Sequence, residues 1–177
     1  MGCTKKINEN EDILWTRRSY LDEIERIENE NNSFPWNREE FIKNLRDSDI
    51  ISTSYLIGED VVGYSFFGLY NDRIELLNLG VDKRFWGRGI GGHFIGILKD
   101  TLLPLRQRKK IEAIVREGDL PMQVFLRGQE FKAVEILENW YDNNFEDGYL
   151  FEFRTDAKRM YLPKNRISEH LNGTPIW

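Results

Sequence analysis

The residues best suited to chemistry in this chain lie in the segment 79–92. Four glycines fall within six residues there: Gly87, Gly89, Gly91 and Gly92. Glycine has no Cβ, so successive backbone N–H groups can converge on one anion, and the N-terminus of a following helix adds its dipole. Arg84 and Arg88 add positive charge beside this loop. The pattern predicts a loop that binds a pyrophosphate group.

Two other interpretations of the glycine loop differ in strength. A dinucleotide-binding fold needs its glycine loop after the first strand, whereas this loop follows the fourth predicted strand. A loop in which the glycines only form a tight turn remains an alternative. The pyrophosphate loop is the interpretation that we favour.

The spacing of apolar residues predicts the elements that position this loop, beginning with three near the N-terminus. Residues 11–17 predict a strand, and Ser19 is expected to cap a first helix. Asn37, followed three residues later by Glu40, is a capping-box pattern at the start of a second helix.

Three strands and a helix are expected on either side of the loop. Segments 50–57 and 61–69 are β-type and are joined by a glycine-containing turn, which is a hairpin signal. Segment 73–81 is nearly all apolar, as in a strand that is buried on both faces. A helix is expected from Gly89 to Leu103.

The remaining elements are a strand at 110–116, a helix that opens at Leu120–Pro121, and strands at 131–140 and 147–155. The resulting order of elements predicts an α/β fold, a mixed sheet with helices on both faces. We expect one domain, residues 1–155. The polar segment 156–177 lacks clear periodicity and is expected to be a C-terminal extension.

Composition and charge exclude several classes of function. The chain has 177 residues and a formal net charge of −5, and it has no basic run, so we expect no nucleic-acid partner. Its one cysteine is Cys3 and its histidines are His93 and His170, so we expect neither a disulfide nor a metal site. No run of about 18 apolar residues is present, so we expect no membrane association and a cytoplasmic protein.

The glycine loop resembles the signature of the GNAT superfamily of N-acetyltransferases, which is an Arg or Gln, two residues, and then Gly-x-Gly or Gly-x-Ala. Gly89 and Gly91 match the two glycines, whereas Trp86 stands where the Arg or Gln is usual. The resemblance implies a mixed, mainly antiparallel central sheet of about six to seven strands, flanked by about four helices on both faces. It also implies acetyl-CoA as co-substrate.

By the same resemblance, the chain would bind acetyl-CoA mainly through its backbone. Leu79, Gly80 and Val81 would pair with the pantetheine arm like an added strand. The pyrophosphate would lie on the glycine loop. The residues implied for that part of the site are Gly87, Arg88, Gly89, Ile90, Gly91 and Gly92.

Short matches outside the loop resemble the ribosomal-protein alanine N-acetyltransferase (RimI) family, over roughly residues 12–154. They are Phe34-Pro35-Trp36, Val115-Arg116, Asn139-Trp140-Tyr141 and Glu146-Asp147. The resemblance implies acetyl transfer to a protein N-terminal α-amine, which in that family is the alanine of small-subunit ribosomal protein 18. Phe34, Pro35 and Trp36 would then wall the groove for the acceptor peptide.

The catalytic side chains of that family are missing here. Its glutamate position holds Ile114, its tyrosine position holds Leu126, and an asparagine that contacts the cofactor is replaced by Asp119. A general base and a general acid each contribute about 10²–10⁴-fold, so substitutes are expected unless proximity alone suffices.

Glu117 is the first candidate base, because it lies at the C-terminal end of the predicted strand 110–116. Glu112 and Glu75 rank behind it. Tyr141 is the candidate acid or substrate clamp. For the glutamates a solvated surface position is the alternative, and for Tyr141 a packing role.

Two alternatives remain open for the function. The acceptor could be a small amine or a lysine side chain instead of a protein N-terminus. The chain could also be an acyl-CoA-binding or protein-interaction module on a decayed scaffold, which Ile114 and Leu126 favour. Turnover of acetyl-CoA separates this module from both enzymes.

Overall fold

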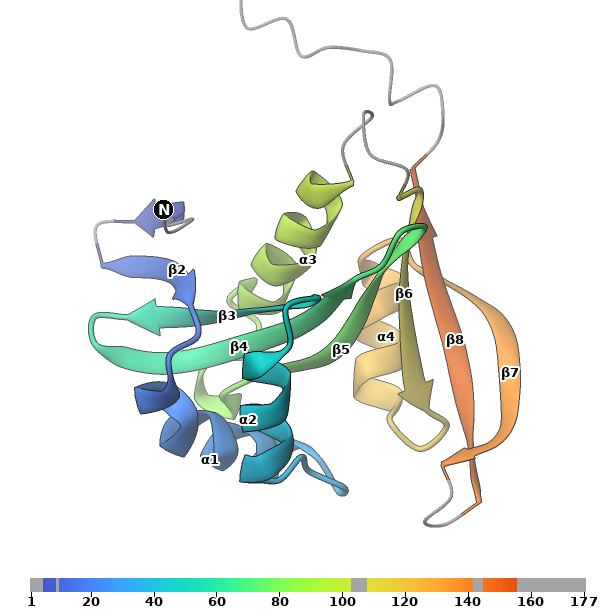
Figure 1. Cartoon of the computed structure of the whole chain (residues 1–177), viewed down its shortest axis with the longest axis horizontal. Helices are drawn as coiled ribbons and strands as arrows, with labels where there is room; N and C mark the ends of the chain where they lie inside the picture. Colours follow the sequence, from blue (N-terminus) through green and yellow to red (C-terminus); the bar gives the residue numbers. More distant parts are fainter. Residues whose placement is uncertain (1–4, 9, 103–107, 142–144, 156–177) are drawn as a thin grey trace, which may run out of the picture.

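One sheet runs through the part of the chain that the computed structural model describes, residues 5–8, 10–102, 108–141 and 145–155 (Figure 1). Its strand order is β1-β2-β3-β4-β5-β6-β8-β7. The strands are β1 (Lys5–Asn8), β2 (Glu11–Trp15), β3 (Ile50–Ile57), β4 (Asp60–Leu69), β5 (Arg73–Val81), β6 (Lys110–Arg116), β7 (Lys132–Tyr141) and β8 (Glu146–Arg154). Neighbouring strands are antiparallel except β5 and β6, which are parallel. The predicted mixed, mainly antiparallel sheet is confirmed.

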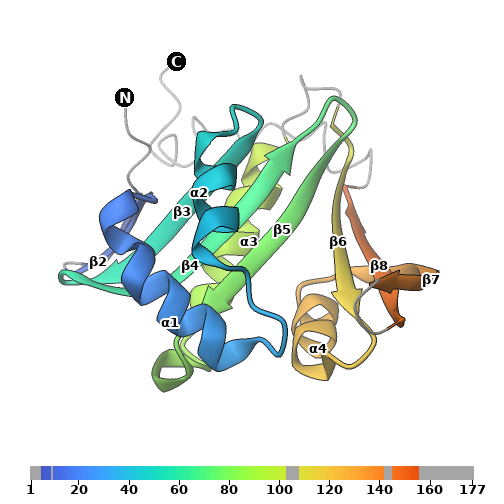
Figure 2. The same ribbon diagram turned by 60° about the horizontal axis from the view of Figure 1, so that its bottom comes forward.

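Helices cover both faces of this sheet, as predicted. They are α1 (Leu21–Asn31), α2 (Arg38–Arg46), α3 (Ile90–Thr101) and α4 (Leu120–Gly128). Figure 2 looks onto α1 and α2, with α3 on the far side of the strands. Short 3-10 turns precede α1, at Arg18–Tyr20, and follow β5, at Lys83–Phe85.

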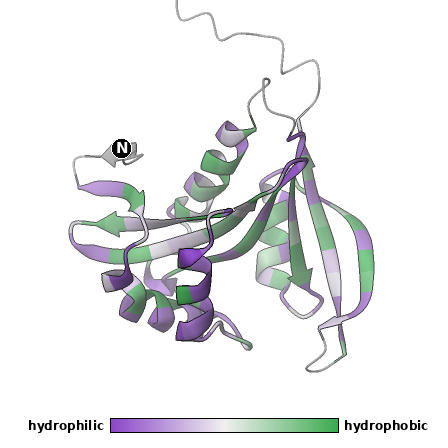
Figure 3. Ribbon diagram, in the orientation of Figure 1, coloured by the Kyte–Doolittle hydropathy of each residue, from purple (hydrophilic) through white to green (hydrophobic). Residues whose placement is uncertain are grey.

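Each helix layer has its own apolar core. On one face, Phe41 of α2 packs with Tyr64 and Phe66 of β4. On the other, Leu98 of α3 and Leu126 of α4 belong to a cluster that covers β5, β6 and β8. Figure 3 shows hydrophilic residues over much of the outer surface of α1 and α2, as expected for helices with one buried face.

The two capping predictions had different outcomes. The Asn37 side chain accepts a hydrogen bond from the Glu40 amide at 3.0 Å, and the Glu40 carboxylate accepts one from the Asn37 amide at 2.7 Å, so the capping box of α2 is confirmed. The Ser19 cap is wrong, because Ser19 lies inside the 3-10 turn and α1 begins after Tyr20. The chain enters α1 through a turn that is already helical, so no side-chain cap forms.

β5 and β6 separate along their length. They are paired only between Arg73–Leu76 and Lys110–Ala113. The prediction of a strand buried on both faces is therefore wrong at Leu77–Leu79, where the side chains are only half-buried. Because β6 diverges there, one backbone edge of β5 is left open.

The sheet ends in two edge strands. β1 was not predicted from the sequence, and β7, at the opposite edge, is largely exposed. The expected extension 156–177 lies outside the described residues. Across the described residues, every helix is too short or too polar to cross a membrane.

Candidate active site

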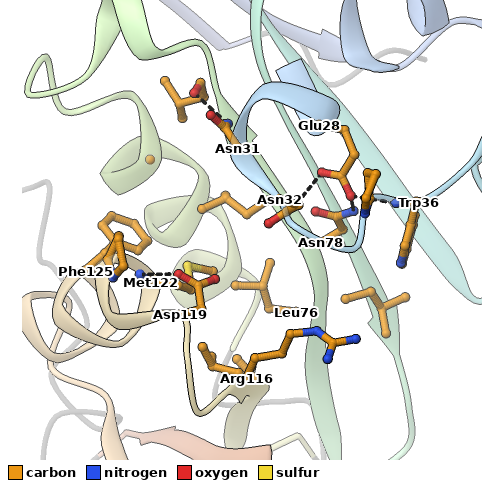
Figure 4. Close-up of a pocket in the computed structure, with 18 of the residues that line it drawn as sticks. Glu28, Asn31, Asn32, Trp36, Leu76, Asn78, Arg116, Asp119, Met122 and Phe125 are labelled. Atoms are coloured by element: carbon orange, nitrogen blue, oxygen red, sulfur yellow. Dashed lines mark hydrogen bonds between the residues drawn. The ribbon is translucent and has the colours of Figure 1, made fainter. Parts of the chain in front are cut away.

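A cavity of about 1070 Å³ opens where β5 and β6 separate (Figure 4). Its walls come from the end of α1 and the loop after it, from β5 and β6, and from the starts of α3 and α4. The glycine loop lines one part of it, and Phe34, Arg116 and Tyr141 line another, here called the mouth. The cavity therefore joins the two segments that the sequence singled out.

The glycine loop forms an anion-binding N-terminus for α3. Gly87 and Gly89 have φ angles of 77° and 82°, in the left-handed region that favours glycine. The first helical bond of α3 runs from the His93 N–H to the Gly89 carbonyl at 3.1 Å. The amides of Ile90–Gly92 belong to the first turn, where N–H groups have no acceptor within the helix. These groups suit a pyrophosphate.

The end of β5 is held by two side chains that line the cavity. The Val81 carbonyl accepts hydrogen bonds from Asn31 Nδ2 at 2.9 Å and from Trp86 Nε1 at 2.7 Å. Leu79 and Val81 line the cavity as well. Trp86, which replaces the Arg or Gln of the GNAT signature, therefore folds back onto β5.

Two residues predicted to bind the cofactor, Gly80 and Arg88, do not line the cavity, and their contacts with the cofactor stay predictions. A Cβ at Gly80 would lie 2.5 Å from the Tyr64 ring, so glycine allows close packing there. The Arg88 guanidinium lies over the Phe85 ring, 5.1 Å from its centroid. The Arg88 side chain is exposed and packs on Phe85 in this arrangement.

The positive charge expected from Arg84 is paired with a buried carboxylate of the protein itself. Arg84 Nη2 and Arg26 Nη2 each lie 2.6 Å from Asp82 Oδ2. Hydrogen bonds from Arg84 and Arg26 hold the pKa of the buried Asp82 well below its usual value. Arg84 therefore braces the start of the glycine loop instead of facing the cavity.

Arg116 connects the two sides of the mouth. Its guanidinium lies 4.2 Å from the Phe34 ring centroid and 3.7 Å from that of Tyr141, and its Nη1 lies 2.9 Å from Glu146 Oε2. Phe34 precedes Pro35–Trp36 in the loop between α1 and α2, and these residues also line the cavity. Burial raises the pKa of Tyr141 above its usual value, so its phenol is neutral at physiological pH.

The sequence profile of the acetyltransferase (GNAT) family matches residues 21–131, from the first residue of α1 to beyond the end of α4. The chain belongs to the acetyltransferase (GNAT) family. It is an acetyl-CoA-dependent N-acetyltransferase, and acetyl-CoA is its co-substrate. The amides at the start of α3 and the open edge of β5 fit the pyrophosphate and the pantetheine arm of that molecule. Comparison with curated proteins finds no match to the chain.

Solved structures of N-acetyltransferases share the fold of this acetyltransferase. The ribosomal-protein-S18-alanine N-acetyltransferase from Escherichia coli is 18% identical, with a TM-score of 0.70, over 86% of this chain and 99% of that one. Naa50 from Arabidopsis thaliana, solved with a bisubstrate analogue, is 16% identical, with a TM-score of 0.68, over 82% and 99%. A Salmonella typhimurium acetyltransferase that modifies the N-terminal serine of ribosomal protein L7/L12 is 11% identical, with a TM-score of 0.71, over 86% and 99%.

The three glutamates considered as bases in this acetyltransferase lie outside the cavity lining. The Glu117 carboxylate accepts a hydrogen bond from Tyr149 Oη at 3.3 Å. Glu112 Oε2 lies 3.0 Å from Arg73 Nε, and Glu75 Oε2 lies 3.5 Å from Arg73 Nη2. Glu117 follows the last residue of β6, and its carboxylate contacts Tyr149 instead of lining the cavity, so its role as the base stays a prediction.

α4 presents Met122 and Phe125 to the cavity, whereas Leu126 is fully buried in the core. Asp119 lines the cavity, and its Oδ1 accepts a hydrogen bond from the Met122 amide at 3.1 Å, which caps α4. A Cβ at Gly91 would lie 3.0 Å from the Phe125 ring. The family tyrosine position therefore points into the core of this chain, and the residue before it faces the glycine loop.

Glu28 and Asn78 line the cavity but were missed in the sequence. The Glu28 side chain is buried, with 1% exposure. It follows Leu21 by seven residues and Ile24 by four, so it lies in the apolar stripe of α1. A charged residue inside an apolar stripe was the sequence signal that could have identified Glu28 as a candidate site residue.

Proposed function

We propose that this acetyltransferase transfers the acetyl group of acetyl-CoA to the α-amine of a protein N-terminus, with ribosomal proteins as the first acceptors to test. The observation that carries the proposal is the cavity that joins the glycine loop to the mouth at Phe34, Arg116 and Tyr141. Phe34 of the loop between α1 and α2, Arg116 of β6 and Tyr141 of β7 line the mouth, where an N-terminal residue and its following chain would enter. Two proteins of the same fold act on the alanine of ribosomal protein S18 and the serine of L7/L12.

We assign acetyl-CoA to the part of the cavity at the glycine loop. Acetyl-CoA supplies a thioester whose acetyl group an amine can attack. The amides of Gly87 and Gly89–Gly92 would hold the pyrophosphate, and Asp119, the N-cap residue of α4, would contact another part of the cofactor. The Val81 carbonyl already accepts two hydrogen bonds, so the backbone nearer Leu79 is left for the pantetheine arm.

The acceptor would lie at the mouth, against Phe34–Trp36. Tyr141 carries a neutral phenol there, which suits a proton donor to the leaving sulfur. The cavity-lining carboxylates Glu28, Glu40 and Asp119 each already accept a hydrogen bond from a backbone amide. We therefore assign deprotonation of the amine to solvent and most of the acceleration to orientation, which supplies about 7–11 kcal/mol in favourable cases.

The organisation of the chain supports two further parts of the proposal. Residues 1–155 would form the catalytic domain, with 156–177 as a peripheral extension. The proposal also places the protein in the cytoplasm. The chain is acidic, and every described helix is too short or too polar to span a membrane.

Mass spectrometry of ribosomal proteins tests the acceptor. The full chain is incubated with acetyl-CoA and dissociated ribosomal proteins, and we expect acetylation of the N-terminal peptide of one or a few of them. A Gly89→Val variant, in which the loop cannot hold its left-handed backbone, is the negative control. Acetylation of lysine side chains or of a small amine alone would replace the N-terminal acceptor. Binding of acetyl-CoA without any acetylation would favour the acyl-CoA-binding module.

A further inference from the structure

Four hydrogen-bond donors converge on the buried Glu28 carboxylate. Its Oε1 accepts from the Trp36 amide at 2.9 Å and from Asn78 Nδ2 at 3.0 Å. Its Oε2 accepts from Asn32 Nδ2 at 2.5 Å and from Tyr64 Oη. A carboxylate has about four lone-pair sites, so Glu28 is fully engaged. It cannot also bind the acceptor amine or take its proton.

Glu28 determines which way the Asn78 amide faces. A carboxylate only accepts hydrogen bonds, so the Nδ2 of Asn78 must lie toward Glu28 and its Oδ1 on the other side. Figure 4 shows this arrangement, with the Asn78 oxygen turned away from Glu28 toward the cavity. Tyr64 Oη lies 3.4 Å from this oxygen, but its single proton serves the shorter contact with Glu28. Burial raises the Tyr64 pKa well above its usual value, so Tyr64 stays a donor.

Asn78 lies near the point where the cofactor arm and the acceptor would meet. It is two residues past Leu76, the last residue of β5 that pairs with β6. A cofactor arm that enters at the glycine loop and follows the open edge of β5 reaches this apex of the gap. Arg116 of the mouth lies across the gap on β6 (Figure 4).

We propose that Asn78 Oδ1 accepts a hydrogen bond from the acceptor amine, and that Glu28 is the positioning residue that holds this oxygen in place. This inference rests on the proposed amine acetylation. A neutral amine has two N–H groups and one lone pair, so fixing one N–H aims the lone pair at the thioester carbon. Asn78 takes up no proton in this role. Because Glu28 also accepts from the Trp36 amide, one carboxylate fixes both the amine and the acceptor wall.

Two substitutions test the two roles. Asn78→Leu removes the acceptor oxygen at similar size, and Glu28→Gln replaces one acceptor oxygen by a donor that favours a turned Asn78 amide. Each should lower kcat/KM for peptides with a free N-terminal Ala or Ser by about 10- to 100-fold, with an unchanged Kd for acetyl-CoA. Asn29→Leu and Glu23→Gln, exposed on α1 outside the cavity, are matched controls and should behave like the wild type.

The double variant separates positioning from general damage to the fold. If Glu28 acts through Asn78, the combined variant should be no slower than the slower single variant. Additive losses, or a full rate in Asn78→Leu, would overturn the proposal while leaving acetyl transfer intact. A folded wild type that binds acetyl-CoA and acetylates none of the peptides would overturn both proposals together. Should Glu28→Gln not fold, the rate of Asn78→Leu alone decides: a kcat/KM lower by about 10- to 100-fold supports the proposal, and a full rate overturns it.

Discussion

Gly89 and Gly96 offer a paired test of the glycine loop. At both positions no heavy atom lies within 4 Å of an added Cβ, so an alanine meets no neighbour. The two positions differ in their backbone. Gly89 has a φ of 82°, whereas Gly96 lies in the middle of α3. The pair therefore isolates the effect of backbone conformation from that of packing.

The two alanine variants should change stability in opposite directions. Gly96→Ala improves helix propensity and should stabilise the fold by about 0.8–1.0 kcal/mol. Gly89→Ala places a Cβ in the left-handed conformation, which costs about 1–2 kcal/mol. One kcal/mol corresponds to about 2–4 °C in the Tm of a domain of this size. We expect Gly96→Ala to raise the Tm. We expect Gly89→Ala to lower the Tm by roughly 2–8 °C.

The same variants should differ in cofactor binding. An alanine at position 89 that relaxes out of the left-handed region moves the amides of the first turn of α3. A hydrogen bond to a charged group contributes about 1.5–3 kcal/mol, so losing one phosphate contact weakens CoA binding by roughly 10- to 100-fold. Calorimetry with CoA measures this change, and Gly96→Ala should bind like the wild type. A Gly89→Ala variant with wild-type Tm and wild-type CoA affinity would refute the reasoning.

Three further substitutions test other parts of the site. Tyr141→Phe should lower kcat by about 10²-fold with little effect on acetyl-CoA affinity, and an unchanged kcat would remove the acid role. Because burial raises the Tyr141 pKa, any loss of wild-type rate from deprotonation of this group should begin at a higher pH than for an ordinary tyrosine. Glu117→Gln should keep the wild-type rate, since Glu117 contacts Tyr149 outside the cavity, and a large loss would restore Glu117 as the base. Asp82→Asn should destabilise the fold by about 1.5–3 kcal/mol at neutral pH in urea unfolding. The folded-state pKa of Asp82 is depressed, so this contribution is complete above the unfolded pKa of about 3.9 and is lost as the pH falls toward the folded value. A difference between wild type and variant that disappeared near neutral pH would contradict this assignment.

Features of the site that depend on neighbouring residues could be predicted from the sequence. The Asn37 cap reaches Glu40 three residues away, and the glycine loop needs only its own backbone and the helix that follows. The direction of Glu117 was harder to predict, because it lies one residue past the end of β6, where its contact with Tyr149 of β8 decides its place. The sequence pattern gives the alternation along a strand but not which face is covered.

Contacts between distant segments were not predictable from local patterns. Glu28 and Asn78 are 50 residues apart, and their hydrogen bond forms only when α1 packs on β5. The gap between β5 and β6 is equally non-local. The apolar run of β5 is typical of a strand with neighbours along its whole length, whereas β6 leaves it after four paired residues.

The short parallel pairing of β5 and β6 gives the sheet a seam. Four residues of each strand, Arg73–Leu76 and Lys110–Ala113, supply the backbone pairing between the β1–β5 half and the β6–β8 half. A molecule in the cavity touches both halves and so bridges the seam. Binding to the folded state adds about 2.7 kcal/mol of stability at a ligand concentration of 100 Kd, and here this free energy acts across the junction. Amides of β6 and β8 should therefore exchange with solvent at rates closer to those of β3 and β4 once acetyl-CoA is bound, because the two halves then open as one cooperative unit.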